Sequence, residues 1–290
     1  LGDFGSQNLG ELLNVKWIVS RAVETSGSLI LNADDELLVA KSAEFPGVIV
    51  WFTLNPDNPT VKEHTRNGGL AFVLDGDSLL RVDGDSIEEI CKSAEIPIAL
   101  DGVASHNIAN ALAAAALTHC LGIPMSDIHE GLTSMSQDNN PGRSNVYSIS
   151  DFKVLVDFAH NPHAMKALFN MAHALPAKRR LLAFAQAGDR TDESIRELAR
   201  SAWSIGLDKV VVSELEAYAR GRSRGEVFGI IRDELINCGA RKDQIQHFME
   251  ETESLDAALD WAQPGDLIIM LALSDREAIQ DKLKSLSSPR

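Results

Sequence analysis

Polar residues that could bind a nucleotide follow an apolar run in the second half of the chain. They form the segment Asp157-Phe158-Ala159-His160-Asn161-Pro162. A carboxylate at the end of a strand can accept hydrogen bonds from ribose hydroxyls, while His160 and Asn161 offer both donors and acceptors. Pro162 ends the strand. The same residues would also form an Asx turn that caps the next helix, so the spacing leaves both interpretations open.

Two further segments carry cations in an acidic chain. The first, Gly188-Asp189-Arg190-Thr191-Asp192-Glu193, ends a predicted strand and begins a helix with Asp192 as its expected N-cap. The second, Tyr218-Ala219-Arg220-Gly221-Arg222-Ser223-Arg224-Gly225-Glu226, places three arginines at alternate positions. Guanidinium groups there could form paired hydrogen bonds with carboxylate or phosphate. A glycine turn and a solvated surface loop are the structural alternatives.

Two asparagines lie near the start of an alanine-rich helix in the first half of the chain, in Ser105-His106-Asn107-Ile108-Ala109-Asn110. Ser105 is the expected N-cap. Asn107 and Asn110 share one helix face, where their amides could bind the edge of an adenine. Asparagine is a poor helix former, and capping of the helix is the alternative reason for its presence.

Two different patterns of helices and strands surround these segments. Residues 134–143 are rich in turn-forming side chains and predict a linker. Before it we expect helices at 9–25, 35–43, 105–121 and 126–134, strands at 28–32 and 48–52, and a hairpin of 70–74 with 78–82. After it, strands at 153–157, 180–184, 209–213 and 266–271 alternate with helices at 163–174, 192–205, 223–237 and 254–262. This alternation predicts a doubly wound parallel sheet, in which ligands bind at the carboxyl ends of the strands.

The composition limits the classes of protein to consider. The chain has 290 residues, of which 27 are Lys or Arg and 42 are Asp or Glu, giving a net charge of −15. A hydrophobic content of 44% is typical of globular proteins and fits about two domains. The acidic balance argues against a nucleic-acid or anionic-membrane partner. The three cysteines lack metal-binding spacing, and no signal peptide or membrane span is recognisable, so we expect a reducing, cytoplasmic location.

The order and spacing of several segments resemble the Mur ligase superfamily, whose members join a carboxylate to an amine using ATP through an acyl phosphate. These segments are Asn32-Ala33-Asp34-Asp35, residues 105–115, Pro141-Gly142-Arg143 and residues 157–162. Residues 188–193, 220–226 and Pro264-Gly265-Asp266-Leu267 look most like the Mur-ligase-like half of cyanophycin synthetase. The resemblance implies an α/β fold, with an incomplete ATP-binding central domain in residues 1–140 and a Rossmann-like C-terminal domain in residues 141–290.

The resemblance also implies roles for individual residues. Asn107 and Asn110 match the helix that faces the adenine, and Asp157 matches the aspartate beside the ribose. Arg143 matches the linker arginine that reaches the phosphates. His160 and Asn161 complete the nucleotide site, and Arg143 and His160 are the candidate catalytic residues.

Magnesium and the second substrate are implied in the same way. Lys16 falls where several relatives carry a carbamylated lysine that helps to hold Mg²⁺. An unmodified ammonium only donates hydrogen bonds, so a carbamate would be needed, and a plain surface lysine is the alternative. Four residues would face the acceptor or growing peptide: Asp189, Arg190, Arg220 and Arg222.

The sequence departs from the family where ATP is held. Mur ligases bind the phosphates on a Gly-x-x-Gly-Lys-Thr/Ser loop, and this chain contains no such loop. Neither Gly68-Gly69-Leu70 nor Gly188-Asp189-Arg190 substitutes for it. The family's magnesium-binding histidine would fall just before Leu1-Gly2, and the chain does not begin with Met. We therefore expect a fragment or a trimmed chain that does not turn over substrate alone.

Two classes of function follow. In the first, the chain is part of an ATP-dependent acid–amino-acid ligase of the cyanophycin synthetase type, using ATP and Mg²⁺. Its substrates would be a small molecule or peptide with a free carboxylate and an amino-acid amine. In the second, it is a truncated, non-catalytic protein that binds a nucleotide or a partner. A homo-oligomer or a partner segment carrying the phosphate loop is possible, and folylpolyglutamate-synthase-like or muramyl-peptide ligases are rival enzymes.

Overall fold

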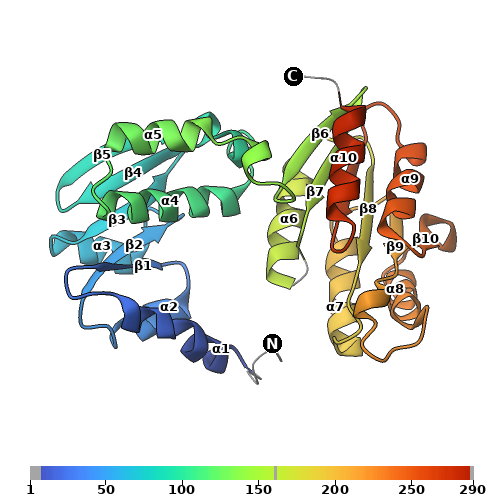
Figure 1. The fold of residues 1–290 in the computed structure, drawn as a ribbon, viewed down its shortest axis with the longest axis horizontal. Coiled ribbons are helices and arrows are strands. Elements are labelled where there is room, and N and C mark those ends of the chain that lie inside the picture. The colour runs from blue at the N-terminus through green and yellow to red at the C-terminus, as the bar shows by residue number, and fades with distance from the viewer. Residues whose placement is uncertain (1–7, 160–161, 288–290) are drawn as a thin grey trace. The chain divides into compact units, whose positions relative to one another are not determined.

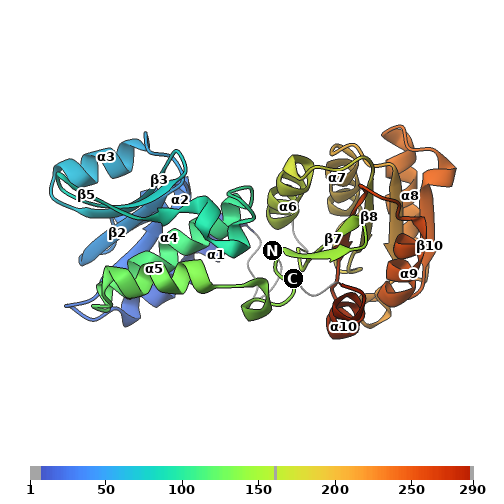
Figure 2. The same ribbon diagram turned by 90° about the horizontal axis from the view of Figure 1, so that it is seen from above.

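The computed structural model describes residues 8–159 and 162–287. The chain divides into two compact units, Leu1–Met135 and Ser136–Arg290, and each has its own sheet (Figures 1 and 2). The division falls inside the segment that the sequence predicts to be a linker. No helix of the described residues is long and apolar enough to cross a membrane.

The first unit is built on a five-stranded sheet in the order β1-β2-β3-β4-β5. The first three strands pair in parallel, and β4 and β5 complete the sheet as an antiparallel meander. The strands are β1 (Ser28–Asn32), β2 (Val48–Thr53), β3 (Leu70–Asp75), β4 (Ser78–Asp83) and β5 (Ser86–Lys92). The helices are α1 (Leu9–Lys16), α2 (Glu36–Ser42), α3 (Pro59–Arg66), α4 (Ser105–Cys120) and α5 (Met125–Ser134). Short 3-10 helices cover Trp17–Ala22, Ser93–Glu95 and Pro97–Ala99.

Each face of this sheet has its own core, because side chains of a strand alternate between the two faces. Helix α4 packs along β1, β2 and β3 and adds Ile108 and Leu112 to a core that contains Phe72. The other face buries Leu31 and Trp51 beneath α2 and α3. The alanines of α4 let it lie close to the sheet, and this fixes the position of the helix that carries the two asparagines.

The second unit contains a six-stranded sheet in the order β10-β9-β8-β11-β7-β6. Five strands are parallel, and β6 pairs antiparallel with β7 at one edge. The strands are β6 (Asn145–Ile149), β7 (Phe152–Asp157), β8 (Arg180–Ala185), β9 (Lys209–Ser213), β10 (Ile245–Phe248) and β11 (Leu267–Leu271). The helices are α6 (Pro162–Ala174), α7 (Asp192–Trp203), α8 (Glu226–Asn237), α9 (Glu251–Trp261) and α10 (Arg276–Leu286). Short 3-10 helices cover Gln137–Asn139, Glu216–Tyr218 and Lys242–Gln244.

Helices cover both faces of this sheet, as a parallel sheet requires. Helix α7 contacts α6 and α8 on one face, and α9 contacts α10 on the other (Figure 2). The central strands are therefore buried along their length, and all five residues of β11 are inaccessible. The predicted α/β class with a Rossmann-like second half is confirmed.

Some sequence predictions were wrong at the ends of elements. The helix expected over 9–25 is α1 followed by a 3-10 helix that begins at Trp17, and neither segment buries a residue that would hold a longer regular helix. Helix α4 begins at Ser105 with Ala104 as its N-cap, and α7 is capped by the Thr191 hydroxyl rather than by Asp192. Five short or peripheral elements were not predicted: α3, β5, β6, β10 and α10.

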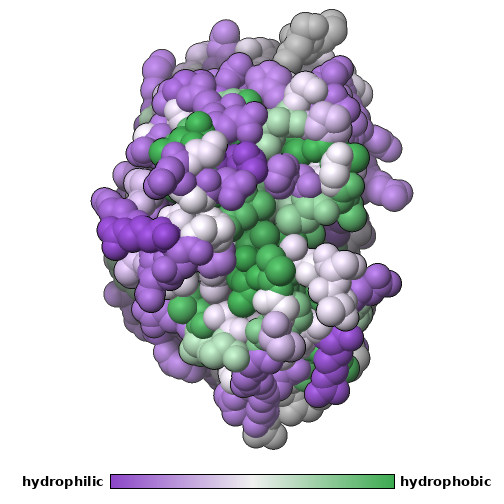
Figure 3. Space-filling view, turned by 90° about the vertical axis from the view of Figure 1, so that its left-hand side faces the viewer, coloured by the Kyte–Doolittle hydropathy of each residue, from purple (hydrophilic) through white to green (hydrophobic). Residues whose placement is uncertain are grey.

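Apolar side chains also reach the surface. Figure 3 shows a face on which they gather in a central group bordered by polar residues. In the first unit Ile87, Val48 and Ile18 are among the exposed large apolar side chains. Contiguous apolar surface is typical of interaction sites. The expected homo-oligomer stays a prediction.

An ion pair joins the starts of β8 and β11. It links the half-buried Arg179, just before β8, to the buried Asp266, just before β11. The Asp266 side chain, 1% exposed, accepts hydrogen bonds from the Arg179 guanidinium, with Nε to Oδ1 at 3.1 Å, and from the backbone N–H of Gln263 at 2.8 Å. The guanidinium carbon of Arg179 lies 4.0 Å from the centre of the Trp261 ring. Burial alone would raise the pKa of Asp266, but these hydrogen bonds and the charge of Arg179 lower it below the ordinary value.

Because the pKa of Asp266 is lower in the folded state, the unfolded state binds the proton first as pH falls. This stabilisation is present above the ordinary aspartate pKa of 3.8 and is lost as pH falls through the lower folded value. We expect Asp266→Asn to lower the free energy of unfolding by about 2–3 kcal/mol at pH 7. Its loss of stability below about pH 4 should be shallower than in the parent chain. Urea unfolding against pH measures both effects, with the surface residue Asp256→Asn as control; equal acid slopes in Asp266→Asn and the parent would contradict the assignment.

Candidate functional site

The loops that follow the parallel strands of the second unit meet at one edge of the sheet. Two neighbouring pockets, of about 160 and 470 Å³, lie there and share the residues after β9. The smaller is lined by residues after β8 and β9, and the larger by residues after β9, β10 and β11. This is the edge at which the sequence predicts ligand binding.

Arg222 holds the loops after β8 and β9 together. Its Nε donates to the carbonyl of Gly188 at 2.9 Å, and Nη2 donates to the carbonyl of Arg190 at 2.7 Å. Its Nη1 lies 2.8 Å from Asp192 and 2.9 Å from Glu226. The side chain is 17% exposed. All of these contacts are internal to the protein, so the geometry shows a structural role, and the predicted contact with substrate stays a prediction.

Gly188 is required by the close approach of the same two loops. A Cβ at this position would lie 2.0 Å from the carbonyl oxygen of Ala219, far inside van der Waals contact. The Gly188 N–H donates to the carbonyl of Tyr218 at 2.9 Å. A glycine here therefore allows the two backbones to pair where a larger residue would separate them.

The other predicted substrate residues lie in the two loops that Arg222 joins. Asp189 is exposed, and its carboxylate lies 3.7 Å from Nε of the half-buried Arg190. Arg220 is exposed and has a left-handed backbone, with φ of 52°. Its guanidinium carbon lies 5.7 Å from the centre of the Tyr218 ring. The structure brings these side chains to one edge, and their contact with substrate is not tested.

Asp157 and Arg143 meet at the other end of this edge. Asp157 ends β7 and is 8% exposed. Its Oδ2 accepts hydrogen bonds from the backbone N–H of Ser144 at 2.8 Å and from the Ser144 hydroxyl at 3.1 Å. Ser144 has a φ of 51° and directly follows Arg143. The carboxylate thus fixes the turn that carries the exposed Arg143 side chain.

Asn145 strengthens the same turn from the first position of β6. Its side-chain amide donates to the carbonyls of Gln137, Asn140 and Arg143, and its oxygen accepts from the N–H of Gly142. These bonds fix the backbone on both sides of Arg143 and leave its guanidinium at the surface. The sequence pattern did not indicate this role of Asn145. His160 and Asn161, predicted to complete this site, lie outside the described residues.

The two asparagines of the first unit differ in environment. The buried Asn107 donates from its amide to the carbonyl of Ile98 at 2.7 Å, which ties the start of α4 to the preceding 3-10 helix. Asn110, on the same helix, is exposed. The structure therefore gives Asn107 a structural bond, and the predicted contact of both residues with adenine is not tested.

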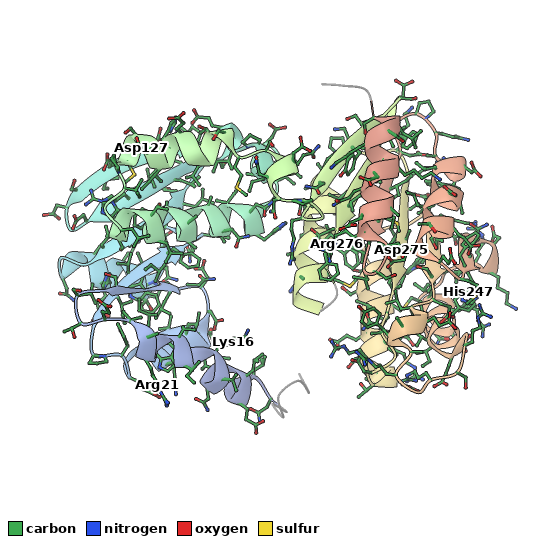
Figure 4. The ribbon with its side chains drawn as sticks, viewed as in Figure 1. Lys16, Arg21, Asp127, His247, Asp275 and Arg276 are labelled. Atoms are coloured by element: carbon green, nitrogen blue, oxygen red, sulfur yellow. The ribbon has the colours of Figure 1, made fainter. Side chains whose placement is uncertain are left out.

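Lys16 ends α1 and is exposed (Figure 4). Among the described residues no group of three or more His, Cys, Asp and Glu side chains is arranged to hold a metal ion. The predicted magnesium role of Lys16 therefore receives no support from neighbouring ligands in the described part of the chain.

The larger pocket contains acidic residues that no sequence motif indicated. Five carboxylates are among its lining residues: Glu214, Glu216, Glu250, Glu251 and Asp275. Glu251 is buried and accepts from the backbone N–H groups of Leu273, Ser274 and Asp275. Glu214 accepts from His247 at 2.8 Å and from the Gly225 N–H at 3.1 Å. They follow β9, β10 and β11, and β10 is too short to have been recognised from its sequence.

Comparison with known proteins identifies the fold family. Residues 142–272 match the family model described as "Mur ligase, glutamate ligase domain". The chain is a relative of the Mur ligases. The resemblance stated from the sequence motifs is therefore confirmed, including the similarity to cyanophycin synthetases.

The similarity to curated cyanophycin synthetases covers most of this chain. It is 32% identical to cyanophycin synthetase from Crocosphaera subtropica over 281 residues, which are 96% of this chain and 32% of that protein. It is 31% identical to the enzyme from Trichormus variabilis, over 97% of this chain and 31% of that protein. The chain thus spans about a third of the length of these relatives.

Solved Mur ligase structures share the fold. MurF from Acinetobacter baumannii superimposes with a TM-score of 0.63 at 17% identity, covering 98% of this chain and 57% of that one. FolC from E. coli in complex with ADP gives a TM-score of 0.56 at 19% identity, over 82% of this chain and 54% of that one. At these identities the comparison establishes the Mur ligase fold alone.

The contacts of Arg222 predict that two arginines of one loop contribute differently to stability. We expect Arg222→Gln to lower the free energy of unfolding by about 2–3 kcal/mol. The substitution removes the guanidinium that donates to two backbone carbonyls and pairs with two carboxylates. Arg220→Gln should change it by less than about 0.5 kcal/mol. Urea unfolding followed by circular dichroism measures both. Protease cleavage in residues 214–225 should also become faster only in Arg222→Gln. Equal unfolding free energies and cleavage rates in the two variants would contradict the structural role of Arg222.

Proposed function

We propose that this chain is part of an ATP-dependent amide ligase of the cyanophycin synthetase type. The observation that carries the proposal is 32% identity to a cyanophycin synthetase over 96% of the chain. Residues 1–140 would contribute part of the ATP-binding central domain, and residues 141–290 the C-terminal domain. An oxygen of the donor carboxylate would attack the γ-phosphorus of ATP, and ADP would leave. The acceptor amine would then attack the acyl carbon, releasing phosphate and losing a proton.

The residues of this chain would position and stabilise charge in that reaction. Arg143 projects from a turn fixed by Asp157 and Asn145 and would stabilise the negative charge on the phosphoryl oxygens. Asn110, exposed on α4, would contact the adenine, and Asn107 would hold the start of that helix in place. His160 and Asn161 are proposed at the same nucleotide site on the resemblance alone.

Mg²⁺ would offset phosphate charge in such a reaction. A carbamylated Lys16 would be the chain's ligand for it, but no neighbouring carboxylate or histidine group among the described residues fits a metal centre. The 290 residues also contain no Gly-x-x-Gly-Lys-Thr/Ser loop, so the proposal assigns phosphate binding by that loop to another segment or partner.

The acidic pocket supports a cationic acceptor. It has a volume of about 470 Å³, and no lysine or arginine is found among the described residues that line it. Exposed Glu216 and Glu250 would attract an amino acid with a cationic side chain, such as arginine. The same charges would repel glutamate, so this pocket disfavours the folylpolyglutamate-synthase-like alternative. A muramyl-peptide ligase and a non-catalytic binding protein are the remaining alternatives.

Amide formation by the intact natural gene product tests the proposal. We expect ATP-dependent ligation of arginine and no ligation of glutamate to a carboxylate donor peptide. Neutralising the pocket with Glu216→Gln and Asp275→Asn together should raise KM for arginine by about tenfold, since a charge attraction of about 1.4 kcal/mol is removed. The KM for ATP should be unchanged. Glu277→Gln on α10, outside the pocket lining, is the matched control.

The outcomes separate the alternatives. Ligation of glutamate in place of arginine would contradict the cationic acceptor, and absence of any ATP-dependent ligation would favour the non-catalytic binding protein. The isolated 290-residue chain is expected to form no product in the same assay. Turnover by that chain would show that its own residues replace the phosphate loop.

A further inference from the structure

Two arginines flank the ring of Phe158, the residue after Asp157. The guanidinium carbon of Arg276 lies 3.9 Å from the ring centre, and that of Arg143 lies 5.7 Å from it. Arg276 is the first residue of α10, and Figure 4 shows it beside Asp275 at the start of that helix. The turn before β6 and the start of α10 therefore each bring a cation to the ring that follows β7.

These two cations have no charge partner in the described part of the chain, where neither guanidinium forms an ion pair. By contrast, Arg81, Arg179 and Arg200 each pair with a carboxylate in this chain of net charge −15. The nearby Asp157 carboxylate is already bound to the N–H and hydroxyl of Ser144. The ring attracts each cation weakly, and the two like charges repel each other.

Buried donors without acceptors lie at the same place. Nε of Arg276 is buried and has no hydrogen-bond partner within residues 8–159 and 162–287. One helical turn further, the side-chain nitrogen of Gln280 is also buried and unpartnered there, and Gln280 is 6% exposed. An unsatisfied buried donor is costly, and an acceptor that reached it would relieve that cost.

Gly142 gives this arginine its space. A Cβ there would lie 2.8 Å from Cδ of Arg276 and 3.3 Å from the side-chain nitrogen of Gln280. Gly142 also has a φ of 77°, a backbone region that side chains disfavour. The turn before β6 therefore passes directly over the side chains of Arg276 and Gln280. Arg143 is the residue after Gly142 in this turn.

We propose that Arg276 is a second anion-binding residue, which together with Arg143 binds an oxyanion beside the Phe158 ring. Guanidinium groups bind phosphate and carboxylate oxygens through paired, charge-assisted hydrogen bonds. The shared ligand chemistry is a compact oxyanion, either a phosphoryl group or a carboxylate. The inference deepens the proposed ligase function, which would supply both kinds of oxyanion.

Binding of simple anions to the 290-residue chain tests this inference. The probes are pyrophosphate and succinate, titrated calorimetrically at low ionic strength. We expect Arg276→Gln to weaken binding of the preferred anion at least tenfold, and Arg276→Lys to weaken it less because the charge remains. Arg232→Gln is the matched control, since Arg232 also lies 5.7 Å from a phenylalanine ring, that of Phe228, but is paired with Asp233. Its affinity should match that of the parent chain.

Preference for pyrophosphate would assign the site to a phosphoryl group, and preference for succinate to a carboxylate. Unchanged affinity in Arg276→Gln, equal losses in Arg276→Gln and Arg232→Gln, or no binding of either anion to the parent chain would overturn the inference. If Arg276→Gln fails to fold, phenylglyoxal modification of the parent chain replaces it. The preferred anion should slow modification of Arg276 more than that of Arg232, and equal rates would overturn the inference.

The outcomes of this experiment distinguish a failure of the anion-binding inference from a failure of the proposed ligase function. Anion binding that depends on Arg276, without any ligation by the intact gene product, would keep the inference and overturn the ligase proposal. Ligation by the intact gene product with anion affinity independent of Arg276 would overturn the inference alone.

Discussion

Parallel pairing of β7, β11, β8, β9 and β10 is the constraint on which the second unit depends. Parallel strands need a helical crossover between them, and every strand then ends at the same edge of the sheet. That geometry brings together loops from Asp157 to Asp275, which are far apart in sequence. The site is therefore a consequence of strand direction, and each loop needs only local contacts to aim its side chains.

Buried carboxylates supply many of those local contacts. Asp157 binds the turn at Ser144, and Glu251 binds three N–H groups after β11. At the opposite edge of the sheet, before β11, Asp266 binds Arg179. A buried carboxylate is costly unless it is hydrogen bonded, and each of these has several donors. In this acidic chain such carboxylates act as internal supports. The guanidinium groups beside Phe158 have no such support, because no carboxylate of the described residues forms an ion pair with them.

The strands and the main helices could be predicted because their periodicity is strong. The strands at Ser28–Asn32 and Lys209–Ser213 were predicted with the bounds that the structure shows. The peripheral strands β5, β6 and β10 were missed, since partly exposed or short strands carry a weak hydrophobic pattern. The sequence also gave no sign that the helix from Leu9 would change to a 3-10 helix at Trp17.

Side-chain direction explains what the sequence could not predict about the site. Arg220 and Arg222 stand two residues apart in one loop, yet one is exposed and the other is held by two carbonyls and two carboxylates. Spacing alone does not distinguish them, because the difference depends on the close approach of Gly188 to Ala219 from another strand. Asn107 differs from Asn110 in the same way, through its bond to Ile98.

Under the proposed ligase function, the charges at this edge of the sheet would separate the two substrates. Acidic side chains gather after β9, β10 and β11, while Arg143 and Arg276 lie at the β7 end of the same edge. An anionic group would be favoured at the β7 end, and a cationic side chain at the other end. Opposite charge at the two ends would orient a donor that carries phosphate and an acceptor that carries a positive charge without any movement of the sheet. Fixing both ends through backbone hydrogen bonds makes that orientation a property of the fold.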